Sequence, residues 1–427
     1  MKQILFIVAA IISFGFSSCY KENDNNSSDN ENKTEQQEVF QEFWDIFDRH
    51  YPLMHRKNID WQTVYNTYYP QINASTTDDQ LFDIFETIIK TVLKDGHTFV
   101  IYSDTKEAFY VPEDNSNIVN MVENNTPNKV NIIGSSANNE YLSYGTLVDD
   151  DEIGYIVSKQ FEPLSENETV EFNAFKSIVD EALSYLQNKK GIIIDVRTNG
   201  GGQTIFAYYL AGRFIHQTGE LEVFRNRYKI AKGSTTASLS DWVLTEADDF
   251  DGYPDSRVEG GTIASTYSDN NKITASGSFQ YAGKVALLTS KHTASAAEHF
   301  TVAMKTQSKV KTIGATTFGI YGGSEYFILS SGNGKWHTNI SVHDTEEMYN
   351  GTYQSFEGSG ITPDELLIPT TEEVNAGRDI HIEMAVTYIN ELPRSKADEV
   401  SNKVRFNFEA ELRGTNPGEI RKKTGYY

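Results

Sequence analysis

Residues 285–298 read VALLTSKHTASAAE, a short apolar run followed by small and polar residues. The run 285–289 is typical of a buried strand, and residues 296–306 have the periodicity of a helix. Ser295 therefore lies at a predicted helix N-terminus, where unpaired backbone N–H groups can hold an anion. Such a serine can be the nucleophile of acyl transfer. Serine is also a common helix N-cap residue, so this segment alone leaves both roles open.

The chain around this segment repeats the alternation of strand and helix. Strands are predicted at 154–157, 192–196 and 284–288, and helices at 170–186, 206–214, 296–306 and from Asp379 onward. This alternation indicates an α/β fold whose mostly parallel or mixed sheet is covered by helices. We assign this domain to residues 151–392, with an extended loop at 230–280 and a charged C-terminal tail at 393–427 that the sequence does not place.

The N-terminal part of the chain has a different pattern. Apolar residues recur at helical spacing in 40–51, after the predicted N-cap Asp60, and in 81–93. We therefore predict an N-terminal helical domain at 39–98. A short β-containing connection is expected to follow it at 99–150.

The first residues of the chain indicate export. Lys2 precedes the apolar stretch 4–16, which is too short for an ordinary membrane-spanning helix and is followed by Ser-Ser-Cys19. This arrangement resembles a bacterial lipoprotein signal. The resemblance implies that residues 1–18 are a signal peptide and that Cys19 is lipidated, which anchors the protein to a lipid bilayer. The alternative is a plain signal peptide in which the cysteine stands by chance.

The segment after the cysteine connects the anchor to the folded part. Residues 19–38 are polar and rich in asparagine, which predicts a disordered tether. Tyr20, not an aspartate, follows the cysteine, and by resemblance to known sorting rules this favours the outer membrane. We therefore expect a cell-envelope lipoprotein that faces the periplasm or the surface.

Composition excludes several classes of function. The net charge of −23 argues against nucleic acid and anionic membrane surfaces as partners. The single cysteine excludes a disulfide within the chain and any metal site built from cysteines. The sequence has no G-x-S-x-G elbow of an α/β-hydrolase, no H-E-x-x-H zinc motif, and no P-loop or dinucleotide-binding glycine pattern. We predict no metal and no cofactor.

Four further segments contain residue types that catalysis uses. They are DGHT at 95–98, DVRTNGGG at 195–202, GATTFG at 314–319 and FEGSGITPD at 356–364. A glycine-rich turn lets the backbone approach a ligand and lend N–H groups, while His97 and Glu357 supply an imidazole and a carboxylate. Taken alone, each segment also has an ordinary explanation, as a tight turn, a structural histidine or a surface glutamate.

In this order the segments resemble peptidase family S41, which includes the tail-specific and tricorn-type serine proteases. The matching motifs are D-G-H-T/S, D-x-R-x-N-x-G-G, S-A-x-E, G-x-x-T-x-G and E-G-x-G-I-x-P-D, and the resemblance covers about residues 40–390. It implies a ClpP/crotonase-like β/α core with an N-terminal helical domain. About 55 residues separate Thr98 from Gly154, too few for the full PDZ domain that many members of the family insert.

The family contains two catalytic arrangements, and one residue chooses between them. The tail-specific branch uses a Ser-Lys dyad whose lysine follows G-x-x-T-x-G, where this chain has Ile320. The tricorn-like branch uses a histidine and a glutamate, which here are His97 and Glu357. It also places a second serine beside the histidine. In this chain Thr98 follows His97 instead, and assistance from its hydroxyl remains open.

The resemblance assigns a role to each site residue. Ser295 is the expected nucleophile, His97 its general base and later acid, and Glu357 the group that orients the imidazole. The backbone N–H groups of Gly201 and Ala296 are the expected oxyanion hole.

The expected function is therefore a serine peptidase that hydrolyses peptide bonds in a peptide or protein substrate. Two alternatives remain at this stage. One is a catalytically silent lipoprotein that binds peptides or glycans, and the other is a non-peptide acyl hydrolase, because a triad does not dictate amide over ester.

Overall fold

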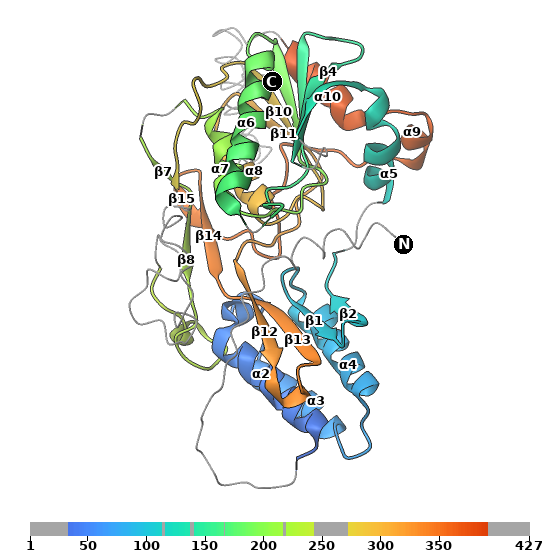
Figure 1. Ribbon diagram of the computed structural model, residues 1–427, viewed down its shortest axis with the longest axis vertical. Helices are drawn as coiled ribbons and strands as arrows, with labels where there is room; N and C mark the ends of the chain where they lie inside the picture. The colour runs from blue at the N-terminus through green and yellow to red at the C-terminus, as the bar shows by residue number, and fades with distance from the viewer. Residues whose placement is uncertain are drawn as a thin grey trace, which may run out of the picture. The chain divides into compact units, whose positions relative to one another are not determined.

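The computed structural model describes residues 33–112, 116–136, 141–165, 167–216, 219–242 and 272–391 (Figure 1). The predicted signal peptide, Cys19 and the C-terminal tail lie outside these ranges, as does most of the predicted loop at 230–280. The described residues up to Ile389 form one compact unit.

A seven-stranded mixed sheet is the centre of the fold. Its strand order is β16-β11-β10-β6-β5-β4-β3. The strands are β3 (Val130–Ser135), β4 (Leu142–Leu147), β5 (Ile153–Ser158), β6 (Gly191–Asp195), β10 (Lys284–Thr289), β11 (Val310–Gly314) and β16 (Glu365–Leu366). Strands β5, β6, β10, β11 and β16 pair in parallel, and β3, β4 and β5 pair antiparallel. The predicted mixed sheet is confirmed.

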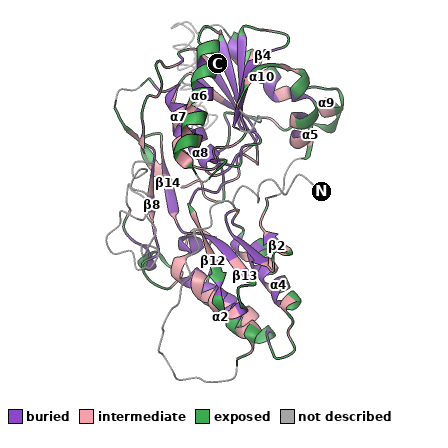
Figure 2. Ribbon diagram, viewed as in Figure 1, coloured by how far each residue is buried: buried purple, intermediate pink, exposed green. Residues whose placement is uncertain are grey.

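Helices cover both faces of this sheet. Helices α6 (Glu168–Leu186), α7 (Thr204–Gly212) and α8 (Ala296–Lys305) share one hydrophobic core with Ile192 and Ile194 of β6. Helix α10 (Ile380–Asn390) packs on the opposite face, against Ile193. Successive residues of a strand point to opposite faces, so a strand that is covered twice is a continuous apolar run. Strand β6 is buried throughout, which Figure 2 shows in purple for the central strands.

The first N-terminal helix begins earlier than predicted, whereas the second begins after its predicted N-cap Asp60. Helix α2 spans Glu35–His50, so its first turn lies inside the range predicted as tether. Thr34 and Gln37 form a reciprocal capping box, in which the backbone N–H of Gln37 donates to Thr34 Oγ1 at 3.2 Å. Gln37 Nε2 also donates to the carbonyl of Ile72 at 2.9 Å. Polar composition suggested a tether here, but these side chains stabilise a helix start through hydrogen bonds that an apolar pattern does not reveal.

The N-terminal region is not closed by helices alone. Helices α3 (Trp61–Tyr68) and α4 (Asp78–Thr87), with a π-helical turn at Ile88–Leu93, follow α2. They pack on an antiparallel sheet of order β12-β13-β1-β2, formed by β1 (Phe99–Tyr102), β2 (Lys106–Phe109), β12 (Ser324–Leu329) and β13 (Trp336–Ser341). Trp336 is 1% exposed and its ring meets Phe85 edge-on. The predicted boundary at residue 98 therefore cuts through a shared core.

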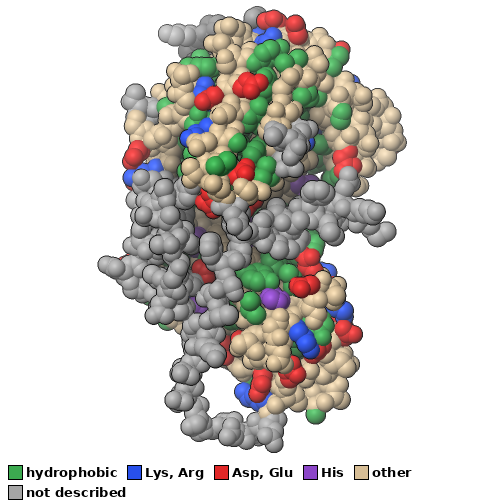
Figure 3. All heavy atoms as spheres, viewed as in Figure 1, with side chains coloured by type: hydrophobic (Ala, Val, Ile, Leu, Met, Phe, Trp, Pro, Cys, Tyr) green, Lys and Arg blue, Asp and Glu red, His purple; other side chains and the backbone are tan. Residues whose placement is uncertain are grey.

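The remaining elements are short. They are α5 (Ser116–Asn124), α9 (Thr371–Asn375), β7 (Leu221–Glu222) paired with β9 (Lys272–Ile273), and the three-stranded β15-β14-β8 ribbon of β8 (Phe224–Arg227), β14 (Asp344–Tyr349) and β15 (Thr352–Gln354). Single 3-10 turns lie at Pro52–Met54, Tyr69–Gln71, Thr126–Asn128, Thr236–Ser238 and Ser330–Gly332. On the face drawn in Figure 3, acidic side chains are scattered over the surface. None of the described helices combines the length and apolar character that crossing a membrane requires.

Candidate active site

Ser295 stands at the turn between β10 and α8 in a strained backbone conformation. Its φ is 52° and its ψ is −124°. Asn333 has nearly the same φ but a ψ of 32°, which is the ordinary left-handed region. A residue with a side chain held where Ser295 lies costs on the order of 1–3 kcal/mol, and such strain concentrates at functional sites. A strand-turn-helix geometry also exposes the nucleophilic serine of α/β-hydrolases.

Glu298 fixes this turn from inside the protein. Its carboxylate accepts from the Ser295 N–H at 3.3 Å and from the N–H groups of Gly319 and Ile320, both at 2.8 Å. Thr317 Oγ1 donates to it at 2.5 Å. Burial raises the pKa of Glu298 to about 7, although these four donors favour the charged form. Glu298 therefore connects the Ser295 turn to the loop at 315–322.

The glycine turn lies directly against Ser295. Gly201 has a φ of 106°, and a Cβ atom placed on it would be 2.7 Å from Ser295 Cβ and 2.9 Å from the Ala296 nitrogen. Only a glycine fits there. The Ala296 N–H has no acceptor among the described residues. The Gly201 N–H donates to Asn199 Oδ1 at 2.9 Å. The three residues are thus adjacent, while the use of the Gly201 N–H in an oxyanion hole stays a prediction.

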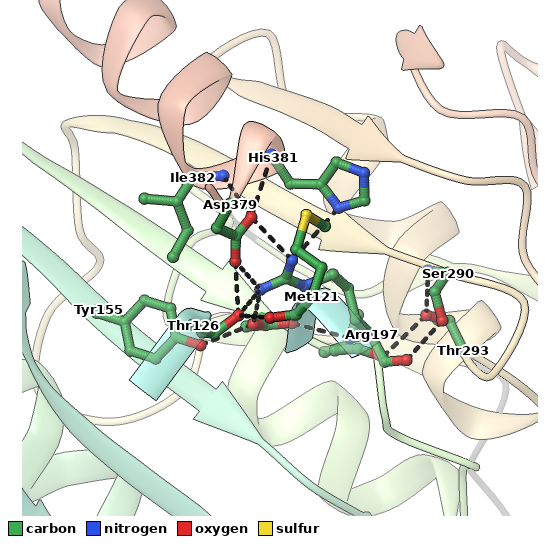
Figure 4. A network of polar contacts seen from close by, with 11 residues as sticks. Met121, Thr126, Tyr155, Arg197, Ser290, Thr293, Asp379, His381 and Ile382 are labelled. Atoms are coloured by element: carbon green, nitrogen blue, oxygen red, sulfur yellow. Dashed lines mark hydrogen bonds and ion pairs between the residues drawn. The ribbon is translucent and has the colours of Figure 1, made fainter. Parts of the chain in front are cut away.

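A buried ion-pair network supports the glycine turn from below. The Arg197 guanidinium lies 2.6 Å from Asp195 Oδ2 and 3.0 Å from Asp379 Oδ2, and Figure 4 shows its contact with Asp379. The hydroxyl of Ser290 donates to the Arg197 carbonyl at 2.5 Å, and that of Thr293 to the Val196 carbonyl at 2.8 Å. These contacts join the D-x-R-x-N segment after β6 to the segment that leads into Ser295.

His97 lies in the buried turn after the π-helical segment. The backbone N–H of His97 donates to Asp95 Oδ1 at 2.9 Å, and Ser341 Oγ donates to Asp95 Oδ2 at 2.8 Å. Burial lowers the pKa of His97, and the charge of Asp95 opposes that effect. A neutral imidazole is the form that can accept a proton. The ring Nδ1 is buried and has no hydrogen-bond partner in the described part of the chain.

Gly96 explains why the histidine turn needs a glycine. A Cβ atom there would lie 2.5 Å from the Phe318 ring and 3.1 Å from Ile320 Cγ2. The absence of a side chain lets the turn that carries His97 press against the loop at 315–322. Thr98, whose assistance the sequence left open, has a buried hydroxyl oxygen without a partner among the residues described.

Glu357 meets the other end of the same loop. Its Oε2 accepts from the Tyr321 N–H at 3.2 Å, and its Oε1 lies 3.3 Å from Lys57 Nζ. Burial and the charge of Asp95 raise the pKa of Glu357 to about 8, and Lys57 opposes this rise. Burial together with the charges of Asp95 and Glu357 also raises the pKa of Tyr51. Lys57, Asp95 and Tyr51 belong to this cluster. The sequence marked Asp95 only as part of the D-G-H-T motif and did not identify Lys57 or Tyr51.

The loop at 315–322 therefore brings the predicted residues into one neighbourhood. It is bonded to the Ser295 turn through Glu298, packs on Gly96 beside His97, and donates to Glu357. Within the described ranges, His97 Nδ1 has no hydrogen-bond partner, and the backbone of Gly322 contacts the imidazole. Catalytic hydrogen bonds are often open without substrate, so the direct Ser-His-Glu contacts stay a prediction. No group of acidic, histidine or cysteine side chains among these residues has the arrangement of a metal site.

Comparisons with known proteins identify the family and the fold. The model of peptidase family S41 matches residues 152–367, which is half of the chain, and that of the tricorn protease C1 domain matches residues 32–90. A protein from Parabacteroides merdae described as a peptidase superposes with a TM-score of 0.64 at 23% identity, covering 84% of this chain and 98% of its own. Mature CPAF superposes with a TM-score of 0.55 at 11% identity, covering 83% and 98%. These two structures share the fold, and no curated protein matches the sequence.

Proposed function

The chain belongs to peptidase family S41 and is a serine peptidase, and from this premise we propose that it cleaves peptide bonds with Ser295, His97 and Glu357. The observation that carries the proposal is the backbone of Ser295. A serine with a φ of 52° and a ψ of −124° is strained. The strained turn holds this serine next to the Ala296 N–H, which has no acceptor among the described residues and can donate to an oxyanion. A helix cap alone needs no such conformation.

The proposed reaction follows the ordinary course of acyl transfer. His97 takes the proton of the Ser295 hydroxyl while the oxygen attacks the carbonyl carbon of the peptide bond. The oxyanion that forms accepts hydrogen bonds from the Ala296 N–H and from the glycine turn, each worth roughly 3–4 kcal/mol in the transition state. His97 then gives its proton to the leaving amine. A water molecule, deprotonated by His97, then attacks the acyl-enzyme. His97 returns the proton to Ser295, and the carboxylic acid is released.

Glu357 acts in this proposal as the group that orients and supports the imidazole. It is buried, and burial together with the charge of nearby Asp95 raises its pKa to about 8. Lys57 at 3.3 Å favours the charged form of Glu357. The pair of acids and the lysine therefore leave negative charge available to stabilise the imidazolium that forms during the reaction.

A fluorophosphonate probe tests the nucleophile. We expect the probe to label the wild-type protein at Ser295 and to leave the Ser295→Ala variant unlabelled. Ser177→Ala, on the exposed face of α6, is the control and should label like wild type. A wild-type protein that does not react would favour the silent binding lipoprotein over an enzyme.

Substrate panels then separate peptidase from esterase. Wild type and Ser295→Ala are compared on a peptide library and on a panel of acyl esters. Cleavage of peptides that disappears in Ser295→Ala supports the proposal. Hydrolysis confined to esters would instead identify a non-peptide acyl hydrolase.

We also propose that the protein is a lipoprotein of the outer membrane, because Cys19 follows a signal-like segment and Tyr20 replaces the aspartate of inner-membrane sorting. Expression with a labelled fatty acid tests this proposal. Wild type should carry the label and fractionate with outer membranes, and Cys19→Ala should do neither. A labelled Cys19→Ala variant would contradict it.

A further inference from the structure

A second histidine–carboxylate pair lies one helical turn beyond Ser295. His299 is on α8, and its N–H donates to the Ser295 carbonyl at 3.2 Å. Its ring Nδ1 lies 2.5 Å from Glu347 Oε1 on β14, in ion-pair contact. The two side chains are 5% and 1% exposed.

Both ring nitrogens of His299 face acceptors. Nδ1 meets the Glu347 carboxylate, and Nε2 lies 3.2 Å from the carbonyl oxygen of Tyr321. A neutral imidazole has one N–H, so a ring between a carbonyl and an ionised carboxylate satisfies both acceptors only as the imidazolium. Burial raises the pKa of Glu347, and the charge of His299 opposes that rise and favours the ionised carboxylate. Burial lowers the pKa of His299, but the charge of Glu347 outweighs burial and the pKa lies above its usual value. With both nitrogens engaged, His299 cannot replace His97 as the base.

Tyr321 connects this pair to the catalytic carboxylate. Its carbonyl accepts from His299, and its N–H donates to Glu357 Oε2 at 3.2 Å. Its ring also meets the His299 ring edge-on, with centroids 5.3 Å apart. The Tyr321 backbone thus contacts His299 through its carbonyl and Glu357 through its N–H.

We propose that His299 and Glu347 are a positioning pair for the reaction at Ser295: they orient the Tyr321 peptide toward Glu357 and keep a fixed positive charge beside His97. The proposal rests on the function proposed above. His299 touches neither substrate nor the reacting atoms, so its effect passes through Tyr321 and through its charge.

The charge of His299 gives the proposal a signature in the pH profile. The charged groups that act on His97 are Asp95 on its own turn and His299 on α8. Lys57, Tyr51 and Glu357 interact in turn with Asp95, and Glu298 and Glu347 interact with His299. Among them, His299 disfavours the protonated form of His97, because the charges are alike. Removing that charge raises the pKa of His97. The activity then begins at a higher pH, because His97 must be neutral to act as a base.

The test compares His299→Gln, Glu347→Gln and the double variant with wild type. We expect kcat to fall about tenfold with little change in KM, and the acidic limb of kcat/KM to move up by about half a pH unit. Glu347→Gln shifts the limb in the same direction, because His299 without its carboxylate loses its proton. The double variant removes both charges together. It keeps the test possible if a single variant misfolds, because one unpaired buried charge destabilises the fold more than the loss of both charges.

His55→Gln is the matched control. The His55 ring also lies between a carbonyl and a carboxylate, 2.9 Å from the Pro52 oxygen and 3.3 Å from Asp344 Oδ2. It should leave the acidic limb in place. The fraction of protein labelled by the fluorophosphonate measures how much of the enzyme is active. A folding defect therefore lowers the labelled fraction but leaves the acidic limb of kcat/KM at the same pH.

The outcomes separate this inference from the proposed function. An acidic limb that stays in place in all three variants overturns the positioning role, even where the labelled fraction falls. Unlabelled wild type at Ser295 overturns the proposed function itself. A shifted limb and reduced kcat, at full labelling, support the pair.

Discussion

At the scale of single residues, Arg197 is a cation that the fold encloses completely. It lies between Asp195 and Asp379, which themselves accept from Tyr155 and Thr126. Its carbonyl accepts from Ser290 on the way to the nucleophile. A buried ion pair adds little net stability, but the loss of one partner leaves a charge without compensation. The loss of Arg197 should therefore cost more stability than the ion pairs themselves contribute, because Asp195 and Asp379 would remain buried without a cation.

Arg197→Met should lower the free energy of unfolding by about 3–5 kcal/mol, because two carboxylates remain buried without their cation. Urea denaturation followed by circular dichroism measures the change. Arg378→Met is the control, since Arg378 pairs with Glu373 and Glu383 at the surface and its loss should matter little. Equal effects of the two substitutions would contradict the role given to the network.

The sequence could identify site residues only where a motif marks them. Ser295, His97, Glu357 and the glycine turn were marked, and contacts of the loop at 315–322 bring them into one neighbourhood. Lys57 was not marked, because a contact with Glu357 about 300 residues away leaves no local pattern. His299 could have been noticed from its spacing of four from Ser295 on one helix, but its partner Glu347 could not.

At the scale of elements, the glycine turn after β6 and the turn before α8 depend on each other. Gly201→Ala should abolish activity while the protein stays folded, because the new methyl group would meet Ser295 Cβ at 2.7 Å and displace it. Labelling by the fluorophosphonate probe and circular dichroism measure the two effects.

Gly219→Ala separates the contact from the backbone. Gly219 also has a positive φ, of 95°, but no atom lies within 4 Å of its added Cβ. Both substitutions therefore strain the backbone, and only Gly201→Ala disturbs the nucleophile. If the two variants lost activity equally, strain alone would explain the effect and the close approach would not.

Elements with a local apolar pattern were predicted well. The central strands of the α/β domain are continuous apolar runs, and its helices repeat apolar residues every 3.6 residues. Strands β1, β2, β12 and β13 were missed or left as a connection. They are short, and the partner that buries each one lies far away in sequence. Pairing between distant segments has no signature within either segment.

At the scale of the whole molecule, buried carboxyl groups divide into two sets with opposite pH dependence. The pKa of Asp379 lies below 3.8, because Arg197 outweighs the effect of burial, and that of Asp344 is also lowered by its histidine and arginine partners against burial. The pKa of Glu298 is raised to about 7 and that of Glu357 to about 8, in both cases mainly by burial.

The two sets predict a stability maximum on the acidic side of neutrality. A carboxyl group with a raised folded-state pKa loses its contribution as the pH rises from about 4.5 to its folded value. One with a lowered pKa contributes above about 4 and loses its contribution as the pH falls further. The free energy of unfolding should therefore rise from pH 8 to pH 5 and fall below pH 4. Urea titrations across this range measure it, and a maximum above pH 7 would contradict the assignment.

The strands that complete the N-terminal core come from residues 324–341, after the nucleophile. A chain made from its N-terminus onward releases helices α2 to α4 first, and their apolar stripes have no cover until Trp336 has emerged. The turn that carries His97 precedes β1, which pairs with β13, so it becomes fixed only then. A nascent polypeptide therefore lacks a fixed His97 turn until residues 324–341 have been made.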